Sequence, residues 1–210
     1  MKNIFITGCG SGLGKTLLEY SKNYDCKVFA HYKSSQNDFS GDITQKDFLN
    51  KLPNILFEND IDVFINNAGI YTNDFLVNTP DEQIENIITT NLTSQILITK
   101  RVVKYFKTKK TGLILNVNSL AGKIPSAKES IYCASKSGLY SFSKSLQLEL
   151  LDDNIHIVDL FPGAMKTKMT EYRNNYESLI ETKDISEIIF DIIFKHKNIH
   201  VNELVIRRKY

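Results

Sequence analysis

The sequence predicts an α/β protein with a doubly wound, mainly parallel sheet of about seven strands and helices on both faces. Short apolar runs alternate with longer helical patterns along the chain, which is the order that right-handed βαβ crossovers produce. Several of these runs are apolar without alternation, as expected for parallel strands that helices cover on both sides. A glycine-rich turn follows the first run and opens the first helical pattern.

The predicted elements follow one another in a regular order. We interpret six short apolar runs as strands: 4–7, 28–31, 63–66, 113–117, 155–160 and 204–206. Helical periodicity fills 13–23, 44–58, 81–108, 131–151 and 184–197. Only about six residues separate Tyr32 from a candidate strand at 39–40, whereas a parallel crossover needs about a dozen. We therefore expect a missing helix or a vestigial strand there.

Length and composition exclude several classes of protein. With 210 residues and 42% hydrophobic content, the chain fits one domain spanning 1–210. A net charge of +2 gives no reason to expect a nucleic-acid partner. The three cysteines, Cys9, Cys26 and Cys133, lack metal-type spacing and are expected to be reduced, so we expect no metal. No run approaches ~20 apolar residues and no signal-peptide core is evident, which indicates a cytoplasmic protein without a membrane partner.

The glycine-rich turn predicts a phosphate-binding site. Its sequence is Thr7-Gly8-Cys9-Gly10-Ser11-Gly12-Leu13-Gly14. Glycines permit a positive φ and let backbone N–H groups approach a phosphate at a helix N-terminus. The kinase-type phosphate loop fails because Cys9 stands where its first glycine belongs, and the G-x-G-x-x-G pattern fails at Leu13 or Lys15. The pattern that fits is Thr-Gly-x-x-x-Gly-x-Gly.

Tyr132 and Lys136 form the clearest candidate for catalysis. They are four residues apart in a predicted helix, so their side chains share one face. An ammonium group favours the phenolate, and we expect it to lower the pKa of Tyr132 from its usual value of about 10. The hydroxyl of Ser119, facing the same spot, would hold a carbonyl or alcohol oxygen. The spacing alone also fits a solvated helix face; the glycine turn, which supplies a cofactor site, favours chemistry.

Together with Asn66-Asn67-Ala68-Gly69, Asn91 and Pro162-Gly163 in this order, these motifs resemble the compact single-domain branch of the short-chain dehydrogenases/reductases. The resemblance spans the whole chain. It implies a Rossmann-like, seven-stranded sheet and hydride transfer between NAD(P) and a carbonyl or alcohol carbon of a small-molecule substrate. It also implies a homodimer or homotetramer that pairs the two long helices.

The resemblance assigns roles residue by residue. Tyr132 is the general acid/base, Lys136 binds the ribose hydroxyls and lowers the pKa of Tyr132, Ser119 orients the substrate oxygen, and Asn91 anchors a water that links Lys136 to solvent. The cofactor contacts that it implies are Gly8, Ser11, Gly12 and Leu13 at the pyrophosphate; Asp42 and Ile43 at the adenine; Asn67, Ala68 and Gly69 at the end of the central strand; Tyr132 and Lys136; and Pro162, Gly163 and Thr167 at the nicotinamide.

The position of Asn91 can also be analysed from helical periodicity. It falls on the same stripe as Ile84, Ile87, Ile88, Ile98 and Val102, which should face the core. A buried amide costs about 1–3 kcal/mol unless it is hydrogen-bonded. A satisfied core asparagine and a proton-relay asparagine both fit this observation; with Tyr132 and Lys136 present we favour the relay.

The residues after the second strand bear on the cofactor. An NAD site usually carries Asp or Glu there, and the matching position, near Tyr32, has no carboxylate. We expect Tyr32 and Lys33 to contact the cofactor, with Lys33, Ser34, Ser35 and His31 meeting a 2′-phosphate instead of ribose hydroxyls. A solvated loop lysine is the alternative interpretation of Lys33. The basic residue that NADP-preferring relatives often carry at Ser11 is absent. We expect NADP(H) to be favoured over NAD(H), with reduction as the working direction.

The chain departs from its relatives in the segment after the Pro-Gly turn. Residues 164–183 are fewer than in the usual lid, so we expect a pocket that is open or closed by a partner. Its expected lining is Tyr71, Leu120, Ile124, Ser126, Ala164 and Met165. Lys123, Lys128 and Glu129 near the mouth indicate a polar substrate or simply a soluble loop. A non-catalytic NADP sensor or scaffold is the alternative; a P-loop hydrolase is disfavoured by Cys9 and by the lack of a magnesium-binding Asp after the central strand.

Overall fold

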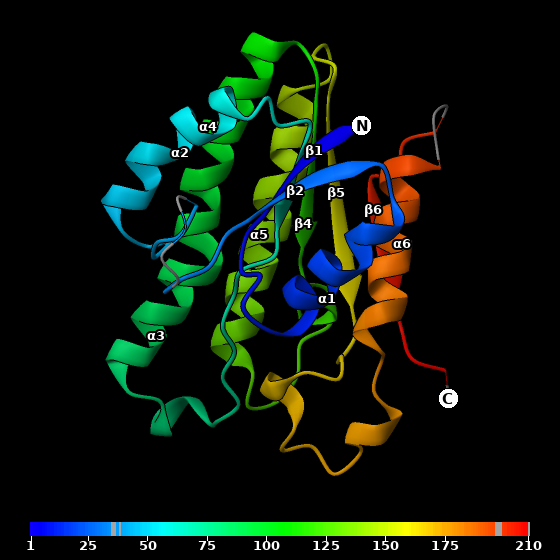
Figure 1. The fold of residues 1–210 in the computed structure, drawn as a ribbon. Coiled ribbons are helices and arrows are strands. Elements are labelled where there is room, and N and C mark those ends of the chain that lie inside the picture. Colours follow the sequence, from blue (N-terminus) through cyan, green and yellow to red (C-terminus); the bar gives the residue numbers. More distant parts are fainter. Residues whose placement is uncertain (35–36, 38, 196–198, 210) are drawn as a thin grey trace.

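The computed structural model describes residues 1–34, 37, 39–195 and 199–209. Its six strands form one sheet in the order β2-β1-β3-β4-β5-β6, and every neighbouring pair is parallel (Figure 1). The strands are β1 (Lys2–Ile6), β2 (Cys26–Ala30), β3 (Val63–Asn66), β4 (Gly112–Val117), β5 (Ile155–Pro162) and β6 (Glu203–Ile206). The strand order reverses between β1 and β3, and such switch points are where open α/β sheets bind ligands.

Helices cover both faces of the sheet. They are α1 (Gly12–Tyr20), α2 (Lys46–Glu58), α3 (Asp81–Ile88), α4 (Ser94–Lys109), α5 (Ser130–Glu149) and α6 (Thr182–Phe194). The helices α2, α4 and α5 pack on one face, and α1 and α6 on the other (Figure 1). Within the part of the chain that the structure describes, no helix combines the length and apolar character needed to cross a bilayer.

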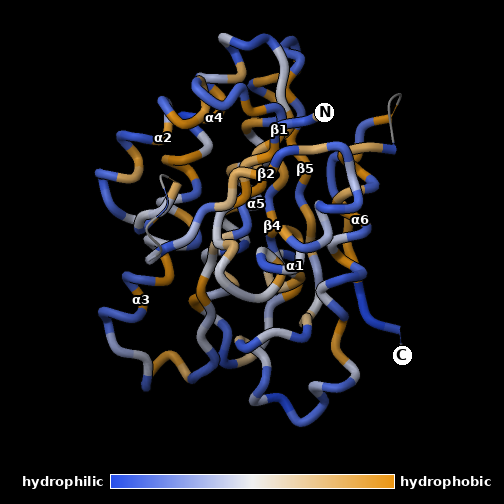
Figure 2. The backbone as a smooth tube through the Cα atoms, in the orientation of Figure 1, coloured by the Kyte–Doolittle hydropathy of each residue, from blue (hydrophilic) through white to orange (hydrophobic). Residues whose placement is uncertain are grey.

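Two apolar cores explain why the strands are apolar on both sides. Successive strand residues point to opposite faces, so Phe5 and Phe64 join the core under α2 and α4, whereas Ile4 and Ile65 join the core under α1 and α6. Figure 2 shows apolar residues gathered along the central strands, with hydrophilic residues on the outer turns of the helices. The predicted doubly wound α/β class is confirmed.

Within the described residues, the sheet has six strands rather than about seven. The candidate strand at 39–40 lies in a turn, where Gly41 N donates to Tyr32 O at 2.9 Å and β2 becomes the edge of the sheet. The connection is too short to hold both a crossover helix and a returning strand. Phe39 is apolar for another reason: its ring packs edge-on against Phe29, with 5.5 Å between the ring centroids.

The predicted helix over 81–108 is interrupted. A single π-helical turn, Thr89–Thr93, lies between α3 and α4 and contains Asn91. Turns of this kind insert one extra residue into a helix and are frequent at functional sites. The 3.6-residue pattern on either side of this turn contains no signal for it, so the sequence predicts one continuous helix.

Candidate active site

Two neighbouring cavities lie at the carboxyl ends of the strands. The larger has a volume of about 540 Å³ and the smaller about 360 Å³. Five of the described residues line both cavities and so lie where the cavities meet: Asn118, Tyr132, Met165, Thr167 and Met169. The larger cavity is lined by the predicted cofactor residues Gly8, Ser11, Gly12, Leu13, Tyr32, Lys33, Asp42, Ile43, Asn67, Ala68, Gly69, Tyr132, Lys136 and Thr167. Ser119, Pro162 and Gly163 line the smaller cavity instead.

The glycine turn between β1 and α1 allows neighbouring backbone segments to approach one another closely. Gly8 has φ +74°, and a Cβ there would lie 2.9 Å from Ala68 Cα. A Cβ on Gly14 would lie 2.2 Å from Gly8 O, so α1 can pack on the turn only without a side chain at that position. Ser11 is the N-cap of α1 and makes no side-chain capping bond. The first N–H groups of the helix therefore lack both intrahelical acceptors and a cap, which fits a phosphate cradle.

Thr7 and Asn67 join the ends of β1 and β3 beneath this turn. Thr7 Oγ1 accepts hydrogen bonds from Asn67 N at 2.9 Å and Ala68 N at 3.0 Å. Asn67 Nδ2 donates to Thr7 O at 2.8 Å and to Gly8 O at 3.1 Å. The floor of the larger cavity is therefore held by side chains that bond the backbone of both strands at the switch point.

Tyr132, Lys136 and Ser119 meet as the sequence predicts. The first two lie on α5, with Lys136 Nζ 5.9 Å from the centroid of the Tyr132 ring. Ser119 follows β4, and its side chain is hydrogen-bonded to Tyr132. Lys136 is buried and donates to Val117 O at 3.1 Å. A phenol, a hydroxyl and an ammonium group therefore converge at the junction of the two cavities.

The prediction that the pKa of Tyr132 is lowered is wrong for the protein without a bound ligand. Burial raises the pKa of Tyr132 to about 12; the hydrogen bond with Ser119 opposes this shift, and the Glu129 carboxylate adds to it. Burial also lowers the pKa of Lys136 to about 8. The ammonium group is directed at the Val117 carbonyl, and desolvation outweighs its effect on the phenol.

Asn91 lines neither cavity, and its side chain is fully engaged. Its Oδ1 accepts from Ile70 N at 2.9 Å, while Nδ2 donates to Ile70 O at 2.8 Å and to Ser135 Oγ at 3.3 Å. These bonds tie the π-helical turn to the loop after β3 and to α5. The amide is thus a satisfied core group, as one of the two interpretations of the sequence expects; the water relay stays a prediction.

The segment after β2 differs in part from expectation. Lys33 lines the larger cavity and pairs with Asp42, with 3.0 Å between Nζ and Oδ2. Although burial opposes it, hydrogen bonds from Thr44 and Lys33 lower the pKa of Asp42. His31 does not present its ring as a phosphate ligand, because the buried ring is bonded to Gly8 N and Gly41 O. Ser34 lines the cavity, and Ser35 lies outside the described residues.

The smaller cavity contains every residue predicted to line it: Tyr71, Leu120, Ile124, Ser126, Ala164 and Met165. It is also lined by a hydrogen-bonded cluster that the sequence did not predict. Arg173 Nη2 donates to Glu129 Oε1 at 3.0 Å and to the Tyr71 hydroxyl at 3.1 Å, and that hydroxyl donates to Glu129 at 2.6 Å. The short segment after β5 therefore reaches back to the N-cap residue of α5, and this cluster lines one side of the cavity.

The two lysines expected near the mouth turn elsewhere. Lys123 Nζ bonds Glu203 at 3.0 Å, and Lys128 Nζ lies over the ring of Phe75 at 4.9 Å from its centroid. Among Lys123, Lys128 and Glu129, the three charged residues expected near the mouth, Glu129 is the one that lines the smaller cavity. No spacing along the chain indicated its partner Arg173, because the two are 44 residues apart.

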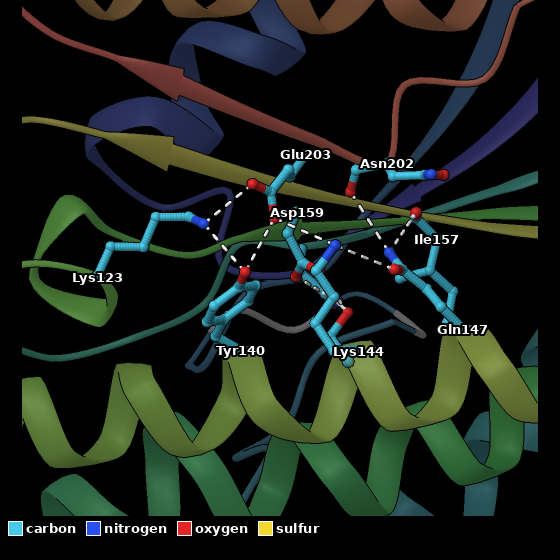
Figure 3. A network of polar contacts seen from close by, with 10 residues as sticks. Lys123, Tyr140, Lys144, Gln147, Ile157, Asp159, Asn202 and Glu203 are labelled. Carbon is cyan, nitrogen blue, oxygen red and sulfur yellow. Dashed lines mark hydrogen bonds and ion pairs between the residues drawn. The ribbon is translucent and has the colours of Figure 1, made fainter.

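A polar network on the sheet side of α5 fixes the helix that carries Tyr132 and Lys136. Figure 3 shows Lys123, Tyr140 and Lys144 converging on Glu203 of β6. The hydrogen bond from Lys123, together with those from Lys144 and Tyr140, lowers the pKa of Glu203 to about 2. One strand further in, buried Asp159 accepts from Ser143 Oγ at 2.5 Å. Contacts along about two turns of α5, from Tyr140 to Gln147, thus set its rotation against β5 and β6.

Comparisons with known proteins agree with this geometry. The model of the short chain dehydrogenase family matches residues 2–178. A 3-oxoacyl-[acyl-carrier-protein] reductase of Chlamydia pneumoniae is 33% identical over 174 residues, covering 82% of this chain and 67% of the relative. An NADP-dependent 3-hydroxy acid dehydrogenase of Schizosaccharomyces pombe is 29% identical, covering 98% and 92% of the two chains.

The fold is also found in solved structures. A 3-ketoacyl-(acyl-carrier-protein) reductase from Brucella melitensis, crystallised with NADH, superposes with a TM-score of 0.86 at 22% identity and covers 97% of this chain and 95% of its own. The family match, the relatives and the cavities that meet at Tyr132 lead to one conclusion. The chain belongs to the short chain dehydrogenase family and is an oxidoreductase.

Proposed function

We propose that this protein is an NADPH-dependent reductase of small carbonyl compounds, with a nicotinamide dinucleotide in the larger cavity and the substrate in the smaller one. The observation that carries the proposal is the position of Tyr132, which lines both cavities. Lys136 lines only the larger of the two and Ser119 only the smaller. A proton donor at this junction can serve a substrate that receives a hydride from the other side.

The residues of the larger cavity suit a dinucleotide. The glycine turn would hold the pyrophosphate through Gly8, Ser11, Gly12 and Leu13, with Asp42 and Ile43 at the adenine end and Asn67, Ala68 and Gly69 along the floor. Pro162, Gly163 and Thr167 would meet the nicotinamide end. The bound cofactor supplies the hydride.

The chain's own groups would manage the oxygen and the proton. Ser119 orients the substrate oxygen, and Tyr132 donates its phenol proton to that oxygen as negative charge develops there. With its pKa raised to about 12, Tyr132 holds this proton at neutral pH. Lys136, whose pKa is about 8, can exchange a proton near neutral pH and replenish the phenol. Asn91 keeps the loop after β3 in place beside Lys136 and would anchor the relay water.

The preference for NADPH is supported by Lys33 and Ser34. Both line the larger cavity near the adenine-end residue Asp42, and a carboxylate that would repel a 2′-phosphate is absent at Tyr32. The S. pombe relative is named as NADP-dependent. Because relatives are named for 3-oxoacyl and 3-hydroxy acid compounds, we propose a carbonyl or alcohol substrate of this general kind. We further propose a cytoplasmic homodimer or homotetramer that pairs α4 and α5.

The test is consumption of NADPH by the purified protein with a panel of 3-oxo esters, ketones and aldehydes, run in parallel with NADH. We expect NADPH to be consumed with at least one class of compound, and faster than NADH. NADPH binding without consumption across the panel would contradict the enzymatic proposal and support the sensor alternative. Faster consumption of NADH would contradict the assigned preference.

A further inference from the structure

The side chain of His31 joins two walls of the larger cavity. It follows β2, is 2% exposed, and its ring lies 4.7 Å from that of Phe48, between centroids. Gly8 N donates to His31 Nδ1 at 3.2 Å, and His31 Nε2 lies 2.8 Å from Gly41 O. Gly8 belongs to the glycine turn, and Gly41 directly precedes the adenine-end residue Asp42. The His31 ring therefore bridges the segment expected to hold the pyrophosphate and the segment expected to hold the adenine.

These two contacts determine the state of the ring. A backbone N–H can only donate and a backbone carbonyl can only accept. Nδ1 must therefore carry a lone pair toward Gly8, and Nε2 must carry the hydrogen that it donates to Gly41. The ring is neutral, in the Nε2–H tautomer. A proton added to Nδ1 would face the Gly8 N–H, and two donors cannot bond each other.

We propose that His31 is a positioning residue for the cofactor, whose neutral ring holds the glycine turn in register with the start of the adenine-end segment. The inference rests on the proposed function, because it assumes a dinucleotide in the larger cavity. It also explains what holds the segment beside β2 in place without a seventh strand. Where a seventh strand and its helix would cover the outer side of β2, only a short connection is present, and the His31 ring bonds that connection to the turn.

The groups around the ring keep it neutral at physiological pH. Burial lowers the pKa of His31, the Gly41 carbonyl opposes this, Lys51 of α2 lowers it further, and Asp42 raises it. Asp42 is itself paired with Lys33. Cys9 from the turn is a neutral thiol, because burial raises its pKa to about 12. We therefore expect the ring to gain a proton only below its ordinary pKa of about 6.5, and cofactor affinity to fall there.

The experiment compares His31→Phe with His31→Asn. Phenylalanine keeps a ring against Phe48 but removes both bonds, so we expect its Kd for NADPH at pH 7.5 to rise about tenfold, the equivalent of one lost hydrogen bond. Asparagine places Oδ1 where Nδ1 stood and restores an acceptor for Gly8, so its Kd should lie within about threefold of the wild type. At saturating cofactor, kcat of both variants should stay within about twofold of the wild type.

The pH profile separates positioning from general stability. As the pH falls from 7.5 through the lowered pKa of His31, the Kd of the wild type should rise, whereas that of His31→Asn should stay flat, because its amide does not titrate. NADH is titrated in parallel, since it lacks the 2′-phosphate that itself gains a proton in this range. His31→Phe that binds as tightly as the wild type, or His31→Asn that follows the wild-type pH curve, overturns the inference. Failure of the wild type to bind either dinucleotide would instead overturn the proposed function; should His31→Phe not fold, His31→Asn alone decides.

Discussion

Burial opposes the ionisation of Tyr132, whose pKa it raises to about 12. A tyrosine in this state is suited to donate a proton to a substrate oxygen rather than to remove one. The Tyr-x-x-x-Lys spacing correctly brings Lys136 near, but the distance of 5.9 Å to the ring centroid and the bond to Val117 O leave the phenol protonated. For reduction of a carbonyl, the protonated phenol of Tyr132 can therefore act directly as the proton donor.

Lys136 should set the alkaline limit of the reaction. Its pKa is lowered to about 8 because its charged form is desolvated, so the charge is present below that pH and lost above it. If the ammonium group binds the cofactor ribose, kcat/KM for reduction should fall as pH rises through about 8, because this ratio reports pKa values of the free enzyme. Measuring kcat/KM for reduction from pH 6 to 10 tests this expected fall. A rate that stays constant to pH 10 would exclude this role.

Lys33 offers a test of cofactor preference that leaves the fold alone. Its side chain is 78% exposed and pairs with Asp42, so Lys33→Gln should have little effect on stability. Loss of a charge-assisted bond to the 2′-phosphate should raise the Kd for NADPH about tenfold. The Kd for NADH, measured as the control, should change less than about twofold. Equal changes for both nucleotides would mean that Lys33 does not contact the phosphate.

At the residue scale, the sequence predicts those site residues whose spacing is local or bound to a motif. Tyr132 and Lys136 share a helix face, and the glycine turn directly follows a strand. The Glu129–Arg173 pair could not be predicted, because its partners approach only after the chain folds. The sequence groups His31 with the residues expected at a 2′-phosphate, but the atoms that its ring bonds depend on the backbone of two other segments.

Strand β5 carries a buried carboxylate that makes stability depend on pH. Burial raises the pKa of Asp159 from 3.8 to about 6, although hydrogen bonds from Ser143 and Asn116 oppose the shift. Because the folded-state pKa is higher than the unfolded one, the folded state binds more protons between these values. The free energy of unfolding should therefore decrease as pH rises through this window.

Asp159→Asn should remove that dependence. Between pH 5 and 7.5, the wild type should lose about 1–2 kcal/mol more of its free energy of unfolding than the variant does. Urea denaturation at the two pH values, monitored by circular dichroism, provides the comparison. Parallel pH curves for the two proteins would show that Asp159 is already ionised at pH 5.

The segment after β5 depends on the contacts between Arg173, Glu129 and Tyr71. Arg173→Met would leave the Glu129 carboxylate without its cation and should lower the free energy of unfolding by about 1–2 kcal/mol, since the pair is only partly buried. Glu129→Gln is the second single variant. In the double variant the loss should be smaller than the sum of the two single losses by about 1 kcal/mol. Additive losses would mean that the pair is not coupled and that another contact holds the segment.

At the scale of elements, the strands and the regular helices could be predicted from their apolar patterns. The turn at 39–40 and the π-helical turn that interrupts the long helix could not. The apolar runs marked all six strands: β3, β4 and β5 are buried on both faces, and the edge strands β2 and β6 keep apolar residues although they are only partly buried. The residues at 39–40 looked like a strand because Phe39 covers the core from a turn. The π-helical turn at Thr89–Thr93 adds one residue without changing composition, so the Asn91 stripe appeared continuous with its neighbours.

At the scale of the whole molecule, helices cover both faces of a parallel sheet, and the two cavities lie along its carboxyl edge. The strand order reverses between β1 and β3, where the larger cavity opens, and the smaller cavity follows toward β4 and β5. The sequence predicted this arrangement because the order of strands, helices and the glycine turn implies the switch point. It could not predict the cluster that lines the smaller cavity, since that depends on a short, irregular segment packing against the N-cap residue of α5.

In the proposed reaction, Tyr132 is the proton donor between the bound cofactor and the substrate. The decisive measurement compares the wild type with Tyr132→Phe in two assays: NADPH consumption with an active carbonyl compound, and the rise in melting temperature on adding NADPH, with ATP as the control nucleotide. Binding to the folded state raises its melting temperature by mass action. We predict that the variant keeps the NADPH-dependent rise, shows none with ATP, and loses at least about a hundredfold in kcat. Turnover at the wild-type rate in Tyr132→Phe would contradict the account.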